Sequence, residues 1–206
     1  MTARSVLITV SNKQTGDVYL ARSYPASDYN SNGKMELYKT PIYQVFIDGT
    51  DDTGGTTRKS WTAVRFAPYY NDPKRSDPHY KHRGWANAGL HHLPKKIVSF
   101  FDPTYATQNT TSPFGGAIQM RGSFLIHAGP ATIQSSGWGS AGCVEVIGNF
   151  DQFKSDIAVL SGVVAGTAND RILALVKAKM LFVQVDYAVP PDFRKAVDSE
   201  VPYQVN

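Results

Sequence analysis

The chain has 206 residues, of which 42% are hydrophobic and 18% charged, which suits one domain with a buried core and excludes a disordered chain or a coiled coil. Its net charge is +4, but the lysines and arginines are scattered, so no basic arm for a nucleic acid is expected. A single cysteine excludes an internal disulfide, and 17 glycines and 12 prolines favour a mainly β (β-rich α+β) fold.

The N-terminal segment is not expected to be a secretory signal, because its apolar stretch, Val6–Val10, is shorter than the roughly 7–15 residues of a signal's hydrophobic region. No window approaches the ~20 apolar residues of a membrane helix. We expect no membrane span and no general export signal, and a chain trimmed of its leader would give the same pattern.

Four strands are predicted before residue 68. Ser5–Ser11 and Asp17–Ser23 alternate and are β-branched, and the polar NKQTG between them predicts a hairpin connection. Ile42–Ile47 and Trp61–Ala67 are the next two strand candidates, separated by the loop DGTDDTGGTT. The aspartates of that loop miss the third ligand of a calcium site, so we interpret them as turn formers; they are Asp48, Asp51 and Asp52.

The interval 68–113 is rich in Pro, His, Asn and aromatic residues and has weak periodicity, which predicts a long irregular insertion. Its histidines have no acidic or thiol partner at ligand spacing, so we expect no metal site; they are His79, His82, His91 and His92. The triplet Asn109-Thr110-Thr111 matches a glycosylation acceptor, but nothing else points to a secretory eukaryotic route.

In the second half of the chain, apolar runs predict strands at Gly122–His127 and Cys143–Ile147, after which the apolar residues recur at helical spacing. Asn149 is a helix cap with Gln152 three residues on, and apolar residues then recur at helical spacing until Gly162. These apolar residues are Phe150, Phe153, Ile157 and Leu160. A second helix from Asn169 to about Lys177 and a last strand at Met180–Val189 follow, and no repeat or linker divides the single domain expected over 1–206.

The stretch FLIHAGPATIQSSGWGSAGCVEV contains the candidate chemistry. His127 ends one predicted strand and Cys143 begins another, so neighbouring strands would bring a thiol and an imidazole to one sheet edge. Gly142 permits close approach of the backbone to a carbonyl, and the amides of Gly142 and Cys143 are candidates for an oxyanion hole. Ser140 is a candidate to orient the imidazole, or a turn residue.

Several other motifs are excluded. Trp138 occupies the first glycine position of a G-x-S-x-G nucleophile elbow. Papain-like enzymes place the catalytic Cys before the His, whereas here His127 precedes Cys143. The loop from Gly49 has Gly55 where a phosphate loop requires Lys.

The His-then-Cys order, with IHAGP, then SAGCV, then a helix from Asn149, resembles the L,D-transpeptidase (YkuD-type) family. The resemblance covers about residues 122–160. It implies a YkuD-like catalytic β-sandwich, a cysteine nucleophile activated by histidine, and no cofactor. The substrate it implies is a peptidoglycan stem peptide, acylated at the bond between residue three and D-Ala four.

Two residues depart from the family pattern. Ala141 stands where a histidine usually precedes the glycine, and Glu145 stands where an arginine is common. Glu145 is either a solvated strand residue or a contact for a substrate amine, in which case Glu145→Gln raises the apparent KM for amine-bearing stems more than for neutral ones. Gly129 and Trp138 are further candidate substrate contacts, and Trp138 has packing in the loop as its alternative role.

The expected activity is therefore L,D-carboxypeptidase or L,D-transpeptidase action in the bacterial periplasm or cell wall. Some members of the family are delivered as antibacterial effectors, which would add an immunity protein as a partner. The alternatives are another cysteine amidase or hydrolase of peptidoglycan, and a non-catalytic wall-binding module with a degenerate site.

Overall fold

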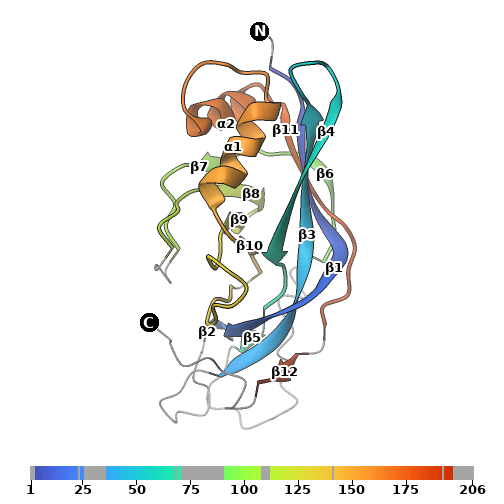
Figure 1. Ribbon diagram of the computed structural model, residues 1–206, viewed down its shortest axis with the longest axis vertical. Coiled ribbons are helices and arrows are strands. Elements are labelled where there is room, and N and C mark those ends of the chain that lie inside the picture. Colours follow the sequence, from blue (N-terminus) through green and yellow to red (C-terminus); the bar gives the residue numbers. More distant parts are fainter. Residues whose placement is uncertain are drawn as a thin grey trace.

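The described part of the chain is built around one large mixed sheet with two helices beside it (Figure 1). The computed structural model describes residues 3–22, 24–25, 36–67, 69–70, 91–107, 112–140, 142–191 and 193–196. Its strands are β1 (Val6–Arg22), β2 (Tyr24–Pro25), β3 (Leu37–Thr50), β4 (Thr56–Val64), β5 (Tyr69–Tyr70), β6 (Leu93–Ile97), β7 (Phe101–Asp102), β8 (Ala117–Arg121), β9 (Phe124–Ala128), β10 (Val144–Val146), β11 (Leu181–Val185) and β12 (Arg194–Lys195). Its helices are α1 (Phe150–Leu160) and α2 (Ala168–Lys177).

Among the described residues the strand order of the main sheet is β6-β11-β1-β3-β4-β10-β9-β8-β7, and β12 pairs with β3. A second small sheet joins β2 to β5. The mainly β fold with a few short helices that was expected from the sequence is confirmed.

The sheet curls until one segment of chain reaches both of its edges. Val98 directly follows β6, and its N–H donates to the Leu181 carbonyl of β11. Two residues later the Phe100 carbonyl accepts a hydrogen bond from Gln119 of β8. The two halves of the sheet therefore face each other across an enclosed apolar core.

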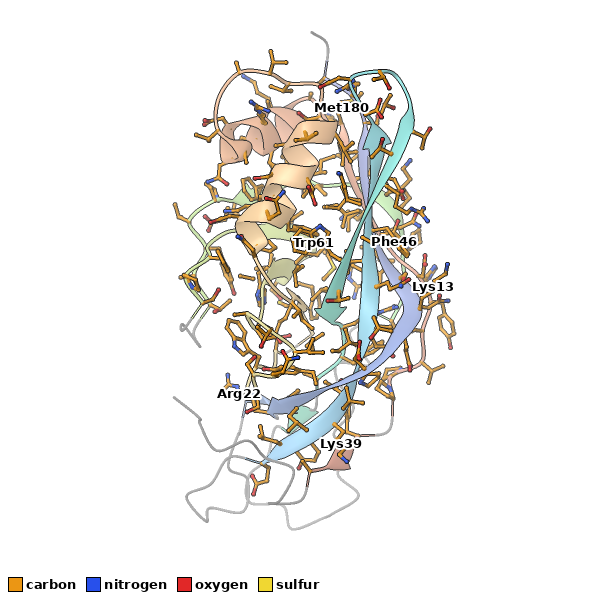
Figure 2. All side chains as sticks on the ribbon, viewed as in Figure 1. Lys13, Arg22, Lys39, Phe46, Trp61 and Met180 are labelled. Carbon is orange, nitrogen blue, oxygen red and sulfur yellow. The ribbon has the colours of Figure 1, made fainter. Side chains whose placement is uncertain are left out.

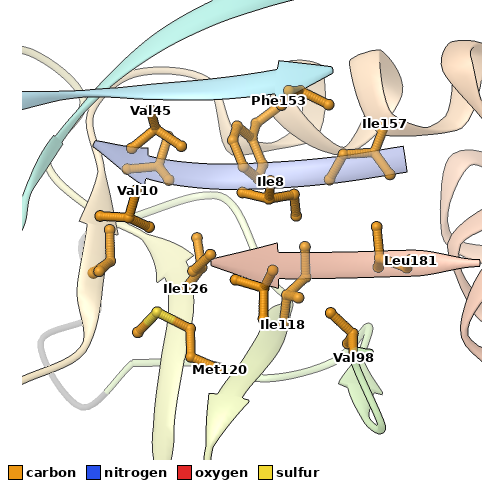
Figure 3. Close-up of a cluster of buried hydrophobic side chains, with 14 of the residues drawn as sticks. Ile8, Val10, Val45, Val98, Ile118, Met120, Ile126, Phe153, Ile157 and Leu181 are labelled. Carbon is orange, nitrogen blue, oxygen red and sulfur yellow. The ribbon is translucent and has the colours of Figure 1, made fainter. Parts of the chain in front are cut away.

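Side chains of both halves meet in this core (Figure 3). Ile8 of β1 lies on one side, Ile118 of β8 and Ile126 of β9 lie on the other, and all three are fully buried. Phe153 and Ile157 of α1 close the core from the helical side. Each such side chain contributes roughly 1.5–3 kcal/mol through removal of apolar surface from water.

The hairpin predicted at NKQTG is wrong, because β1 is one continuous strand. Both of its halves pair antiparallel with β3: Val10 is opposite Val45 and Val18 is opposite Pro41. β1 thus advances eight residues while β3 advances four, and the four additional residues are absorbed at two irregularities. Both apolar halves pair with the same strand, so the exposed polar run bulges outward and the chain does not reverse.

The two helices follow their sequence signals. The Asn149 side chain caps α1 by accepting the Gln152 N–H at 3.0 Å, and Gly162 follows the helix with φ +70°. The predicted apolar stripe is buried. α2 begins one residue before its predicted start, with a capping box between Thr167 and Asp170. Within the described part of the chain neither helix has the length and apolar character needed to cross a membrane.

Part of the interval expected to be irregular is regular. β6 and β7 lie within 68–113 and form the two edges of the main sheet. The alternation in LPKKI is obscured by Pro94 and two lysines, which is why the strand was not predicted. His79, His82 and the triplet Asn109-Thr110-Thr111 lie outside the described residues.

The loop between β3 and β4 is organised by Asp51. Its carboxylate accepts hydrogen bonds from the N–H groups of Thr53 and Gly55 and from the Thr57 hydroxyl. These bonds hold the pKa of Asp51 down at about 2. The turn-forming role predicted for this residue is confirmed, but the same prediction is wrong for Asp48, which lies within β3 and forms an ion pair with Arg58 of β4.

Candidate active site

Two adjacent parallel strands carry the candidate residues. β9 and β10 pair in parallel, with Glu145 opposite His127 and Val144 opposite Ile126. Ile126 and Val144 point into the main core. Because side chains alternate along a strand, His127 and Glu145 lie on the other face of the sheet.

Cys143 lies one residue before the paired segment of β10. Extending the register places it opposite Leu125, two residues before His127 on the same face of β9. Such diagonal neighbours on adjacent strands are roughly 7–8 Å apart. The structure therefore brings the predicted nucleophile and the predicted base to neighbouring positions on one sheet face.

His127 is 4% exposed, and its imidazole has a defined orientation. Nδ1 lies 2.7 Å from the Ala128 carbonyl oxygen, which can only accept, so Nδ1 carries the proton and Nε2 is the basic nitrogen. Burial lowers the pKa of His127 to about 4, although the bond to Ala128 opposes this shift. The imidazole is thus neutral at physiological pH.

The Cys143 thiol is partly buried and is also neutral at rest. Its Sγ donates weakly to the Ser123 carbonyl at 3.9 Å, and the Leu125 backbone hydrogen-bonds to the sulfur. Burial raises the pKa of Cys143 to about 11, and the nearby Glu145 charge adds to the rise. No hydrogen bond joins Sγ to the imidazole among the described residues, so the resting pair is a thiol beside a neutral imidazole.

The loop that precedes the cysteine is held against the far end of β1. The Gly137 N–H donates to the Leu20 carbonyl, and the Arg22 N–H donates to the Trp138 carbonyl. The Tyr19 hydroxyl accepts the Trp138 N–H at 3.2 Å. Figure 2 shows Arg22 far from Met180, which lies near the start of β1. The loop therefore runs from β9 to the C-terminal end of β1.

Trp138 and Gly129 have structural roles in this loop. Trp138 is 6% exposed and packs in a second apolar cluster with Tyr19 and Val64, so its packing role is the one observed. A Cβ on Gly129 would lie 2.8 Å from the Val146 carbonyl oxygen and 2.9 Å from the Glu145 Cβ. Gly129 is therefore needed for close approach of the loop to β10.

Ser140 and Gly142 shape the backbone around the nucleophile. The Ser140 hydroxyl donates to the Cys143 carbonyl at 2.9 Å, and the imidazole is oriented by Ala128 instead. Gly142 has φ +111°, a conformation that strongly favours glycine. Ala141, which replaces the histidine common in the resembling family, lies outside the described residues.

Glu145 is buried beside the candidate pair, which excludes the solvated role. It is 2% exposed, and its Oε2 has no hydrogen-bond partner among the described residues. Burial raises the pKa of Glu145 to about 8, opposed by the charge of Arg22. A buried carboxyl with a free oxygen costs free energy, and such groups are concentrated at functional sites.

Tyr105 belongs to the site and was not predicted. Its ring centroid lies 5.6 Å from that of His127, at an interplanar angle of 40°. The residue comes from the turn after β7, more than 20 positions upstream of His127, and no motif or spacing marks it among the 11 tyrosines of the chain.

Of the four histidines considered as metal ligands, the structure describes His91 and His92. The rings of His91 and His92 pack edge-on against Tyr187. The described residues contain no group of three or more His, Cys, Asp or Glu side chains arranged to bind a metal ion.

Comparison of the chain with family models, with curated proteins and with solved structures found no match. A thiol and an imidazole with Nδ1 bound to a carbonyl lie on one sheet face next to a glycine-rich backbone segment. These are the kinds of group that acyl transfer through a thioester requires.

Proposed function

We propose that the chain is a cysteine-dependent acyltransferase that acts on peptidoglycan stem peptides at the bond between residue three and D-Ala four. Its catalytic domain would then be a YkuD-like variant, with L,D-carboxypeptidase or L,D-transpeptidase activity. The observation that carries the proposal is the parallel register of β9 and β10, with His127 and Cys143 on one face and Ala128 orienting the imidazole.

The reaction follows from the protonation states of the two groups. Sγ of Cys143 attacks the carbonyl carbon while Nε2 of His127 takes the thiol proton, and backbone amides near Gly142 stabilise the oxyanion. The C–N bond breaks, and His127 returns the proton to the departing D-Ala amine. Water or an acceptor amine then attacks the thioester, and the sulfur leaves and is reprotonated through His127.

A neutral resting pair has a consequence for the order of events. With the thiol pKa near 11 and the imidazole pKa near 4, ion-pair formation before substrate arrives is unfavourable. Proton transfer therefore accompanies attack on a bound carbonyl, and Sγ must turn from the Ser123 carbonyl toward His127. The free enzyme should react slowly with iodoacetamide at pH 7.

The test is digestion of purified muropeptides by wild type, Cys143→Ala and His127→Gln, read by mass spectrometry. We expect loss of one D-Ala from tetrapeptides, or exchange for an added D-amino acid, and a fall of at least about a thousandfold in both variants. Cleavage at another bond would indicate a different cysteine hydrolase. Unaltered muropeptides with folded protein would favour a wall-binding module.

The site of action is part of the same proposal, because peptidoglycan lies outside the cytoplasm. Delivery as an antibacterial effector to the periplasm, with an immunity protein in the producing cell, suits an enzyme of this specificity. Periplasmic expression of wild type should slow growth of a recipient bacterium, and Cys143→Ala should not. Equal growth at equal protein levels would contradict the effector role.

A further inference from the structure

We propose that Tyr105 is a positioning residue that covers the imidazole of His127 and keeps it in the neutral, proton-accepting form. The inference deepens the proposed function, since it rests on His127 being the base. It starts from the ring contact between Tyr105 and His127, which is unrelated to the cysteine motif.

Tyr105 is held in place from both sides. On one side, Asp102 accepts hydrogen bonds from the N–H and the hydroxyl of Thr104, which fixes the turn that leaves β7. On the other, the Tyr105 carbonyl accepts the Gly116 N–H at 2.8 Å. The ring is therefore placed by backbone interactions and not by the imidazole alone.

The hydrogen bond between Tyr105 and Gly116 connects the aromatic residue to the strand beside His127. Gly116 precedes Ala117, and Ala117 of β8 is opposite His127 in the antiparallel pair. Residues opposite each other share a sheet face, and a side chain as small as that of Ala117 leaves room beside the imidazole. Gly116 has φ +112°, so this connection also depends on a glycine. Three elements thus converge to bring one aromatic ring onto one imidazole.

The charged neighbours of His127 do not account for its neutral form. On β10 it is opposite Glu145, and Cys143 lies just before that strand on the same face. Both groups favour the cation when they are ionised, and the residue opposite His127 on β8 is Ala117. Arg22, the cation beside Glu145, lies at the end of β1. Burial is the dominant influence on the pKa of the imidazole. Tyr105 is partly buried and its ring packs on that of His127, so we infer that it separates the imidazole from solvent.

Removing the ring should expose the imidazole and move its pKa from about 4 toward the ordinary value of 6.5. The test is an NMR titration with labelled histidine, assigned with His127→Gln, on wild type, Tyr105→Ala and Tyr105→Phe. We expect a rise of about one unit or more in Tyr105→Ala and no change in Tyr105→Phe. Tyr187→Ala is the matched control, because Tyr187 also packs on histidine rings but at another place.

Activity gives a second readout with a distinct pH signature. If the midpoint of the free enzyme rises to 6, about one tenth of the imidazole is neutral at pH 5, so kcat/KM falls about tenfold there and is unchanged at pH 8. A merely structural role would lower activity equally at both pH values. Tyr105→Leu, which retains partial cover, should show a smaller shift in the same direction if Tyr105→Ala fails to fold.

An unchanged His127 midpoint in folded Tyr105→Ala would overturn the inference. The titration does not depend on turnover, so the two proposals fail separately. A shifted midpoint in a protein that leaves muropeptides intact would support the cover and reject the acyl-transfer assignment. An unshifted midpoint in a protein that digests muropeptides would support the acyl-transfer assignment and reject the role of Tyr105.

Discussion

The two faces of β9 and β10 differ sharply although they belong to the same short strands. The face toward α1 carries Ile126, Val144 and Val146, which pack in the main core. The opposite face carries His127 and Glu145, and Cys143 lies on the same face just before β10. Its polar groups are also largely withdrawn from water, and one carboxylate oxygen lacks a hydrogen-bond partner among the described residues.

This difference separates what stabilises the protein from what it can do. Apolar burial on the α1 side lowers the free energy of the folded state, whereas a buried carboxyl and a buried imidazole raise it unless they are compensated. The core clusters hold the polar face in a geometry that the polar groups would not adopt alone. Substitutions on the two faces should therefore have separable effects on stability and chemistry.

The largest stability effect is expected on the α1 face. Phe153 is fully buried and packs against Trp61, with ring centroids 5.6 Å apart. Phe153→Ala should lower the free energy of unfolding by about 3–5 kcal/mol through lost burial and a cavity. The alkylation rate of Cys143 should stay unchanged at temperatures where the variant is folded. The exposed Val159 of the same helix offers a control, and Val159→Ala should change stability by less than about 0.5 kcal/mol.

A smaller, pH-dependent effect is expected for Glu145 on the opposite face. Its folded-state pKa of about 8 lies above the ordinary 4.5, so its contribution is fully present below pH 4.5 and is lost as pH rises through 8. Wild type should thus lose about 2–4 kcal/mol between pH 5 and pH 8.5 from this group. Glu145→Gln should flatten that decline in urea unfolding experiments. Parallel pH profiles for the two proteins would contradict burial of a titrating carboxyl.

The smallest effect is expected at Ser140. Ser140→Ala removes one hydrogen bond to the Cys143 carbonyl and should cost about 0.5–1.5 kcal/mol of stability. Turnover of muropeptides should fall less than about tenfold, because Ala128 orients the imidazole. A loss as large as that of His127→Gln would make Ser140 part of the catalytic machinery after all.

The elements with strong local signals could be predicted from the sequence. The cap at Asn149, the apolar stripe of α1 and the second helix depend on interactions within a few residues. The two strands at His127 and Cys143 were also predictable, because both residues adjoin apolar runs, whereas their parallel pairing is seen only in the fold. The hairpin at NKQTG failed because a polar run between two strands predicts a reversal, and only the shared partner β3 makes it a bulge.

The site was harder to predict where it depends on distant segments. The sequence pattern around Glu145 is that of a solvated strand residue. Its burial depends on β4, β9 and the loop at Gly129, which enclose it in the fold. Tyr105 reaches His127 only through the turn at Asp102 and the hydrogen bond from Gly116. These contacts join positions that have no common periodicity, so no local pattern indicates them.

The position of β1 in the sheet also bears on how the protein is made. β1 is the first strand of the sheet to be synthesised, yet it lies between β3 and β11, and Val6 pairs with Leu181, 175 residues later. The seam between β1 and β11 cannot close until β11 itself has left the ribosome. Pairings of such high contact order slow folding, and they leave the edge of β1 accessible to chaperones throughout synthesis.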